Sequence, residues 1–355
     1  MLLSKGKVRL ADIARASGVS QGTASNVFSR PEVVRDEVRE HVLAVARDLG
    51  YAGPSVTGRL LRAGKVNAIG VAAIEPLAYF FDDPWARAFL AALADVCDAK
   101  GTGLTLVSAR NQQKLSWNIQ SALVDGFILL CVEGGERLVE LTRERQLPFI
   151  SLALGSDDQS IPAIGVNNID GAATAARHLT RLGHRRFVIL ATEFTDDHVG
   201  RISAPEIERG DVYSTSRDRA VGYWHALAEV GIAREVVPVF ETQNDRPSVH
   251  ACLEQVFSTA ERPTAILAMS DNIAMLAMAW LTDHGLNVPV DISIVGFDGV
   301  PEGGMVKPGL TTMAQPFQEL AVRAVHAILD DAIPTEREII EVKLIERGST
   351  AAPKT

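Results

Sequence analysis

Residues 10–28 read LADIARASGVSQGTASNVF, a pattern of two short helices joined by a tight turn. Ile13 and Ala14 lie at helical spacing from the apolar residues around them and give the first helix an inner face. Gly18 supplies the left-handed backbone conformation that ends a helix, and Ser20 can cap the next one. In a helix-turn-helix of this kind, the second helix enters the major groove of DNA.

The segment 8–28 resembles the N-terminus of the LacI/GalR family of bacterial transcription regulators. The resemblance continues along the chain, through R-P-T-A-I at 262–266, G-F-D at 296–298 and R-G-S-T at 347–350. It implies an N-terminal all-α helix-turn-helix head and an α/β core of two lobes, with doubly wound parallel sheets like those of periplasmic binding proteins. An ordinary helical hairpin is the alternative interpretation of the motif.

Residues 18–22 also match G-x-S-x-G, the motif that carries the nucleophilic serine of many hydrolases. That motif needs a buried strand before the serine, whereas a helix is expected before Ser20. We therefore interpret Ser20 as a helix cap and a phosphate contact.

The first turns of the second helix carry side chains that suit DNA recognition. Gln21 and Asn26 can each pair with adenine through two hydrogen bonds, and Gly22 lets the backbone approach closely. Thr23 and Ser25 suit phosphates, which position a protein without specifying sequence. With the cap residue included, the predicted DNA-binding residues of this helix are Ser20, Gln21, Gly22, Thr23, Ser25 and Asn26. A solvated polar face is the alternative for any one of them.

Charge is distributed unevenly along the 355 residues, whose net charge is −9. Residues 1–65 hold eleven Lys and Arg against six Asp and Glu, which gives +5, so the remainder carries −14. A basic head on an acidic body confines the attraction for phosphates to the head.

The composition argues against several other classes of protein. No apolar run reaches the roughly 18 residues of a membrane helix, and the short, charged start does not resemble a secretory signal. Cys97, Cys131 and Cys252 are isolated, so neither a disulfide framework nor a metal site is expected. No P-loop or dinucleotide fingerprint indicates a cofactor, and no residues assemble into a catalytic set. We expect a cytoplasmic protein that is not an enzyme and has no membrane partner.

Residues 51–65, YAGPSVTGRLLRAGK, are predicted to link the head to the core. The family resemblance implies that this stretch forms a short hinge helix on operator DNA, with a leucine wedged into the minor groove. The spacing to residues 62–65 makes that leucine Leu61, whereas counting from residues 50–51 makes it Leu60. A flexible linker without a hinge helix is the alternative.

From residue 67 the pattern changes to alternating strands and helices, which predicts parallel sheets covered on both faces. The first set has strands at 68–74, 104–108, 126–130 and 149–152 and helices at 85–99, 112–123 and 136–145. The second set has strands at 186–190, 236–239, 265–268 and 293–295 and helices at 218–229, 248–258 and 273–284. Two such sets predict two lobes, with a ligand bound beyond the carboxyl ends of their strands.

These patterns and the resemblance divide the chain into five predicted parts. The parts are a head at 1–50, a hinge at 51–65, lobe 1 at 66–183 with about 313–335, lobe 2 at 184–312 with about 336–350, and a tail at 351–355. The resemblance alone implies that the chain returns to lobe 1 and that a last strand, 338–345, belongs to lobe 2.

The resemblance also implies which residues meet an effector in the cleft. Ser270 stands where the family commonly has Asn, and the aromatic segment 79–85 should bring ring faces to the same place. The predicted effector-binding residues are Phe80, Phe81, Asp82, Trp85, Asp170, Arg219, Ser270, Asp298 and Gln315. Aromatic faces beside such hydrogen-bonding groups suit a sugar or a nucleoside. Core packing is the alternative for the aromatic residues, and a structural ion pair is the alternative for Arg219 and Asp298.

Residues 195–217 form a long polar stretch with little periodicity. Loops of this length are commonly functional or disordered. A lid over the cleft and a solvated insertion are both open interpretations.

Together these features predict a transcription regulator that acts as a repressor. It is expected to bind near-palindromic operator DNA as a homodimer. A sugar-like or nucleoside-like effector between the lobes is expected to control operator affinity, as inducer or as corepressor. A solute-binding protein and a cleft enzyme of the same core fold are the alternatives, and the basic head argues against the first.

Replacing the first residue of the second helix tests the predicted base contact. Gln21→Ala should weaken operator binding by about 1–3 kcal/mol and relax the preference at one base pair, because Gln reads adenine through two hydrogen bonds. Affinity is measured at fixed salt on operators that differ at single base pairs, since phosphate contacts make binding salt-dependent. An equal loss on every sequence would show that Gln21 does not read a base.

Overall fold

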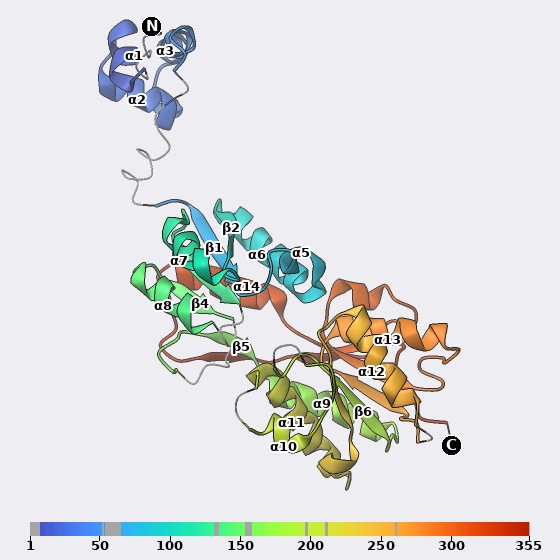
Figure 1. The fold of residues 1–355 in the computed structure, drawn as a ribbon. Helices are drawn as coiled ribbons and strands as arrows, with labels where there is room; N and C mark the ends of the chain where they lie inside the picture. The colour runs from blue at the N-terminus through green and yellow to red at the C-terminus, as the bar shows by residue number, and fades with distance from the viewer. Residues whose placement is uncertain are drawn as a thin grey trace, which may run out of the picture. The chain divides into compact units, whose positions relative to one another are not determined.

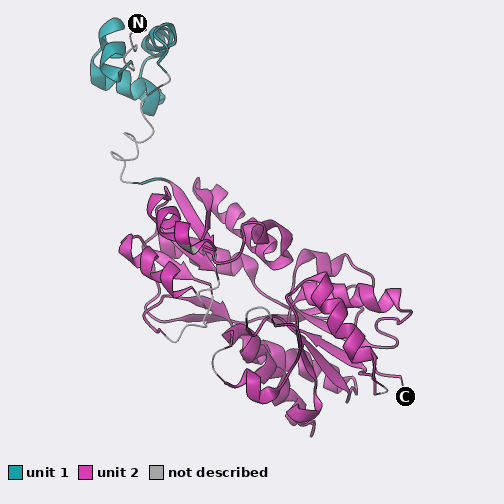
Figure 2. Ribbon diagram, in the orientation of Figure 1, with its two compact units in different colours: residues 1–66 teal, residues 67–355 magenta. Residues whose placement is uncertain are grey.

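The computed structural model describes residues 8–51, 53, 65–130, 135–152, 158–195, 198–209, 212–259 and 261–354. The chain separates into two units, residues 1–66 and 67–355, which Figure 2 colours differently. Leu60 and Leu61, the two candidates for the hinge leucine, lie outside the described residues.

The described part of the first unit is a head of three α-helices. They are α1 (Leu10–Ala16), α2 (Gln21–Ser29) and α3 (Asp36–Asp48), with a 3-10 turn η1 (Pro31–Val33) before α3. Gly18 has a φ of +65°, as the turn after α1 requires, and Ser20 caps α2 by accepting from the Thr23 N–H (3.0 Å). A small core of Ile13, Val27, Val42 and Ala46 holds the helices together. The predicted helix-turn-helix is confirmed.

The second unit begins with a four-stranded parallel sheet of order β2-β1-β3-β4. Its strands are β1 (Ala68–Ala73), β2 (Gly103–Ser108), β3 (Gly126–Leu130) and β4 (Phe149–Ser151). The helices between them are α5 (Tyr79–Asp82), α6 (Pro84–Lys100), α7 (Gln112–Ser121) and α8 (Glu136–Glu144). Every residue of β3 is buried, which fits a strand covered on both faces.

A second sheet of seven strands has the order β13-β11-β10-β9-β6-β8-β7. Its parallel centre consists of β6 (Phe187–Ala191), β8 (Val239–Glu241), β9 (Ala265–Ala268), β10 (Ser293–Asp298) and β11 (Thr311–Ala314). Antiparallel strands β7 (Gly200–Ile202) and β13 (Lys343–Ile345) form its two edges. The accompanying helical segments are α9 (Asn168–Arg181), α10 (Ala204–Ile207), α11 (Ser214–Ala228), η2 (Arg234–Val236), α12 (Arg246–Phe257), α13 (Asp271–Asp283) and η3 (Pro301–Gly304).

The chain crosses between the two sheets three times. After β11 it returns as α14 (Phe317–Leu329), which packs against α6, β3 and β4 of the first sheet, as Figure 1 shows. Between the sheets, β5 (Ile164–Val166) pairs with β12 (Glu338–Ile340). The chain then continues into β13, so the second sheet is completed by residues that come after α14 in the sequence.

Three predicted elements differ from the structure. The strand expected at 236–239 begins only at Val239, because Pro238 has no N–H to give to a ladder. The single strand expected at 338–345 is two strands that pair with different partners. The stretch 195–217, expected to lack regular structure, contains β7, α10 and the start of α11.

Helix α9 differs from the predicted lobe limits, which placed residues up to 183 in lobe 1. It packs against α11 and against β9, β10, β11 and β13 of the second sheet. Its apolar face is made largely of alanines, so it can lie close to its neighbours. The crossing from the first sheet to the second therefore falls at β5, before α9.

Among the residues that the structure describes, no helix combines the length and the apolar character needed to cross a membrane.

A methyl group added where α9 meets α11 tests how tightly the two helices pack. A Cβ on Gly222 would lie 2.2 Å from the Ile169 carbonyl oxygen and 2.9 Å from Ala172 Cβ. Gly222→Ala should therefore lower the free energy of unfolding by about 1–3 kcal/mol, as overpacking does, even though Ala favours helices. Denaturant unfolding measures it, with Gly103→Ala as control, since the nearest atom there is 3.7 Å away. Equal stability of the two variants would contradict the tight contact.

Candidate functional site

The recognition helix α2 directs its polar residues away from the core of the head. Ala24 and Val27 are buried, whereas Gln21 and Gly22 are exposed. The Ser20 hydroxyl lies 2.9 Å from the Thr23 hydroxyl, so both groups take part in the cap. Ser25 and Asn26 are half-buried one turn further on. The side-chain amide of Gln21 is exposed at the start of the helix, where it can reach the edge of a base. The DNA contacts of all six predicted residues stay predictions.

In the second unit, Arg219 is a charged residue with almost no exposure to water. It lies on α11, and 5% of its surface is exposed. Its Nε donates to Asn168 Oδ1 (2.9 Å), and its Nη1 donates to the carbonyl of Met269. The guanidinium also lies over the Phe297 ring, with Cζ 3.8 Å from the ring centroid. These contacts replace much of the water that a guanidinium loses on burial.

Asp298 is the counter-charge of Arg219. It ends β10, and its Oδ1 lies 3.9 Å from Arg219 Nη1. Gln315 Nε2 donates to the same oxygen (2.8 Å), while the Asp271 N–H donates to Oδ2 (3.3 Å). Burial raises the pKa of Asp298 well above its ordinary value, although the nearby Arg219 charge opposes that shift. The φ of +137° at Asp298 is a backbone conformation that side chains rarely adopt, so the site holds it under strain.

Asp271 contacts the turn that follows Asp298. Its Oδ2 accepts the N–H groups of Gly299 and Val300 (2.8 Å each), and Thr312 Oγ1 donates to its Oδ1 (2.5 Å). Burial raises the pKa of Asp271, and the Thr312 hydrogen bond opposes the shift. Because it fixes the turn after Asp298, Asp271 acts as a positioning residue.

A second polar group bridges the two sheets. Asn244, which follows β8, donates through Nδ2 to Asp83 Oδ2 (2.9 Å) at the start of α6. Its Oδ1 accepts from Ser270 Oγ (2.7 Å), and its carbonyl accepts from Asn272 Nδ2 (2.6 Å). Burial raises the pKa of Asp83, although the hydrogen bonds to its carboxylate oppose the shift. A further contact between the sheets joins Arg87 to Glu302.

The aromatic residues predicted to contact the ligand have different surroundings in the structure. Phe80, predicted as a ligand contact, is 1% exposed and belongs to the core, so packing explains it. Trp85 stacks on Phe89, with ring centroids 5.6 Å apart, and its buried Nε1–H has no hydrogen-bond partner among the described residues. Phe81 is 63% exposed, and Asp82 is exposed beside it.

The sequence-predicted site residues separate into two groups. Ser270 belongs to the polar group around Asn244, whereas Arg219, Asp298 and Gln315 lie within one network of polar contacts. Asp170 does not join it, because its carboxylate is exposed and accepts from Asn167 at the start of α9 (2.7 Å). Its neighbour Asn168 contacts Arg219 in its place.

No metal or thiol chemistry is evident in the parts of the chain that the structure describes. No group of three His, Cys, Asp or Glu among those residues could hold a metal ion. Cys97 and Cys252 are buried, and burial raises the pKa of each to about 11, so they are poor nucleophiles. Cys131 lies outside the described residues.

Comparison with known proteins gives two family matches. Residues 9–53 match the bacterial regulatory proteins of the lacI family, and residues 176–350 match a periplasmic binding protein-like domain. An HTH-type transcriptional regulator of Mycobacterium tuberculosis is 34% identical over 354 residues, and the alignment covers 98% of each protein. The chain belongs to the LacI family.

Two further likenesses come from repressors. The HTH-type transcriptional repressor PurR of Erwinia tasmaniensis is 30% identical to this LacI-family chain, with 96% of each covered. The Lac repressor dimer, in a crystal structure with operator and the anti-inducer ONPF, has a TM-score of 0.74 and 25% identity over 97% of this chain and 99% of that one. The predicted fold is thereby confirmed, and this LacI-family protein is a DNA-binding regulator of transcription.

Sequence reasoning missed Asn168, Asn244 and Asp83 as members of the polar network. Asn168 and Asn244 follow the ends of parallel strands, and that position was the signal by which they could have been found. Asp83 stands directly before Pro84, a pattern typical of a helix cap, so its second contact to Asn244 had no sequence signature.

Introducing a charge at Asn244 tests the contact between the two sheets. Asn244→Asp would place a second carboxylate beside Asp83, and the two should repel each other when both are ionised. We expect a loss of stability of about 1–3 kcal/mol at pH 7, which shrinks near pH 4 because a shared proton removes the repulsion.

The melting temperature at both pH values measures this effect. Asn244→Ala is the matched control, because it removes the amide without adding a charge and its deficit should be similar at the two pH values. A deficit of Asn244→Asp that does not depend on pH would contradict the proximity of the two side chains.

Proposed function

We propose that this protein represses transcription by binding a near-palindromic operator as a homodimer, and that a sugar-like or nucleoside-like effector controls its affinity for DNA. The observation that carries the effector site is the buried pair of Arg219 and Asp298. Removing two opposite charges from water costs free energy that their mutual attraction seldom returns as stability. A buried pair of this kind therefore points to a binding role.

The position of the polar network supports an effector site. Asn168, Asn244, Ser270, Asp298 and Gln315 each stand at or just after the carboxyl end of a parallel strand. The carboxyl ends of parallel strands meet at one edge of a sheet, and ligands of α/β proteins bind there. For the four residues that follow strands of the second sheet, this position supports an effector site.

The chemistry of the network supports a ligand with several hydroxyl groups. A guanidinium donates hydrogen bonds and a carboxylate accepts them, so Arg219 and Asp298 together match the two roles of a hydroxyl. The serine and amide side chains around them, Ser270 and Gln315, supply both donors and acceptors.

Control of DNA binding would follow from a change in how the two sheets meet. Asn244 with Asp83, and Arg87 with Glu302, hold the present arrangement together. An effector that prefers one arrangement shifts the population toward it in proportion to its difference in affinity. In a dimer, such a shift alters whether two heads can engage two half-sites at once, and much of the affinity depends on that.

A solute-binding protein and an enzyme that uses the cleft are the alternatives. The helix-turn-helix head favours regulation over solute transport, and we propose that the protein works in the cytoplasm without catalysing a reaction. A turnover assay with each effector found would detect an enzyme.

The effector is sought first, and the site is then tested with a variant. Thermal-shift screening of the full chain against sugars and nucleosides should give a ligand that raises the melting temperature. Arg219→Ala should bind operator as the wild type does but respond to that ligand with a roughly ten- to hundredfold weaker midpoint, because a charged donor is lost.

The control for this experiment is Arg217→Ala, since Arg217 lies on the same helix and pairs with Asp218. It should leave the midpoint unchanged. An unshifted midpoint for Arg219→Ala would remove Arg219 from the effector site, and loss of operator binding without effector would assign it a structural role.

A further inference from the structure

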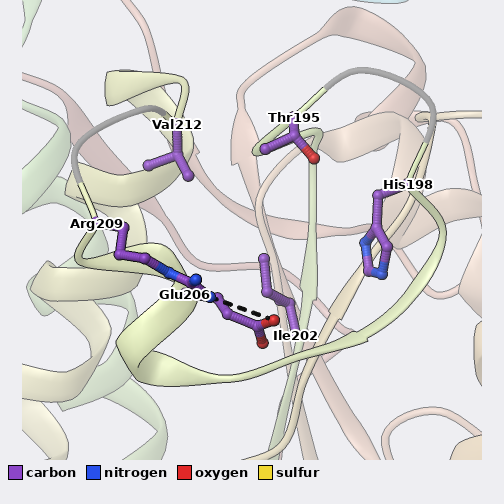
Figure 3. Close-up of a pocket in the computed structure, with 6 residues that line it drawn as sticks. All are labelled: Thr195, His198, Ile202, Glu206, Arg209 and Val212. Atoms are coloured by element: carbon purple, nitrogen blue, oxygen red, sulfur yellow. Dashed lines mark ion pairs between the residues drawn. The ribbon is translucent and has the colours of Figure 1, made fainter.

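Described residues between β6 and α11 line a cavity that the regulator function does not use. Its volume is about 220 Å³, and the described residues that line it are Thr195, His198, Ile202, Glu206, Arg209 and Val212. Figure 3 shows Glu206 and Arg209 on one side of the cavity and His198 on the other. None of these residues belongs to the network around Arg219 and Asp298.

A buried carboxylate fixes the His198 side of the cavity. Glu241 is fully buried at the end of β8, and its Oε1 accepts the N–H groups of Phe194 (2.6 Å) and Thr195 (2.9 Å). Its Oε2 lies 2.5 Å from His198 Nδ1. Since Phe194 and Thr195 both donate to Glu241, the carboxylate serves as an acceptor there, and this contact fixes the imidazole ring of His198 at the wall of the cavity.

The opposite side carries one negative and one positive group. Glu206 Oε2 accepts from the Ser203 N–H (2.9 Å) and hydroxyl (2.5 Å), and these bonds lower the pKa of Glu206. Its Oε1 lies 3.5 Å from Arg209 Nη2. Both side chains are about half exposed, so the pair contributes little energy and a ligand can replace it.

These groups match a molecule that carries an ammonium and a carboxylate together. Glu206 accepts hydrogen bonds as an ammonium requires, while Arg209 can bind a carboxylate through two parallel bonds. Ile202 and Val212 add an aliphatic surface for a small side chain. A volume of about 220 Å³ is below the roughly 300–1,000 Å³ of typical ligand pockets, so the ligand is small.

We propose that this cavity is a second binding site, which takes a free α-amino acid with a small aliphatic side chain. A simple anion would meet the carboxylate of Glu206, and a simple cation would leave Arg209 unused. Only a ligand with both charges satisfies both Glu206 and Arg209.

The site is joined to the helix that carries Arg219. The Tyr213 N–H donates to the Phe194 carbonyl (2.9 Å), and Ser216 Oγ donates to the Glu193 carbonyl (2.6 Å). An amino acid in the cavity would therefore stiffen the segment from which α11 starts. Its binding does not depend on the effector site proposed above.

Calorimetric titration of the full chain tests the site with three probes of similar shape: L-valine, isobutylamine and isobutyrate. L-valine should bind, and each analogue with a single charge should bind at least about tenfold more weakly, because one charge-assisted contact is missing. Arg209→Gln and Glu206→Gln should each weaken L-valine by a similar factor.

Arg201→Gln is the matched control, because Arg201 is exposed on β7 and does not line the cavity. It should bind L-valine as the wild type does. Three results would overturn the proposal: no heat with any probe, isobutyrate or isobutylamine binding as tightly as L-valine, or full affinity retained in Arg209→Gln and Glu206→Gln. Since Arg209 and Glu206 are largely exposed, their replacement leaves the fold intact, which circular dichroism checks.

Discussion

Arg219 keeps a full positive charge where only 5% of its surface meets water, and the second sheet is arranged to make that possible. A buried guanidinium is costly unless several groups accept its hydrogens. Its partners come from separate segments: Asn168 follows β5, the Met269 carbonyl follows β9, and Asp298 ends β10. These strands must keep their register for the charge to be satisfied, so the geometry of the site depends on how the strands pair.

The close approach of α9 and α11 is part of that solution. Gly222 lets the Ile169 carbonyl come near α11, and Gly171 makes room for Phe297 and Val342. With larger residues the helices would separate, and Asn168 would move out of reach of Arg219. The absence of side chains at Gly222 and Gly171 thus permits the polar contact between Asn168 and Arg219.

Much of this fold was predictable because its signals are local. Gly18 and Ser20 set the turn and cap of the head through their own backbone and side-chain chemistry, and alternating apolar runs located most of the strands. Non-local contacts were not predictable in the same way. The separate pairings of β12 and β13, and the contact of Asn244 with Asp83, join residues far apart in sequence. In the site, family resemblance located Arg219 and Asp298, but it did not indicate that Phe80 packs inside or that Asp170 faces solvent.

The late position of β13 also affects how the protein is made. The core residues of the head are synthesised by Ala46, whereas the second sheet receives its edge strand only with Lys343–Ile345. At about 5–20 residues per second, translation of the intervening roughly 300 residues takes on the order of 15–60 s. For that interval a nascent chain presents a recognition helix attached to an incomplete core. Until β13 is synthesised, β11 has no partner strand on that side of the second sheet.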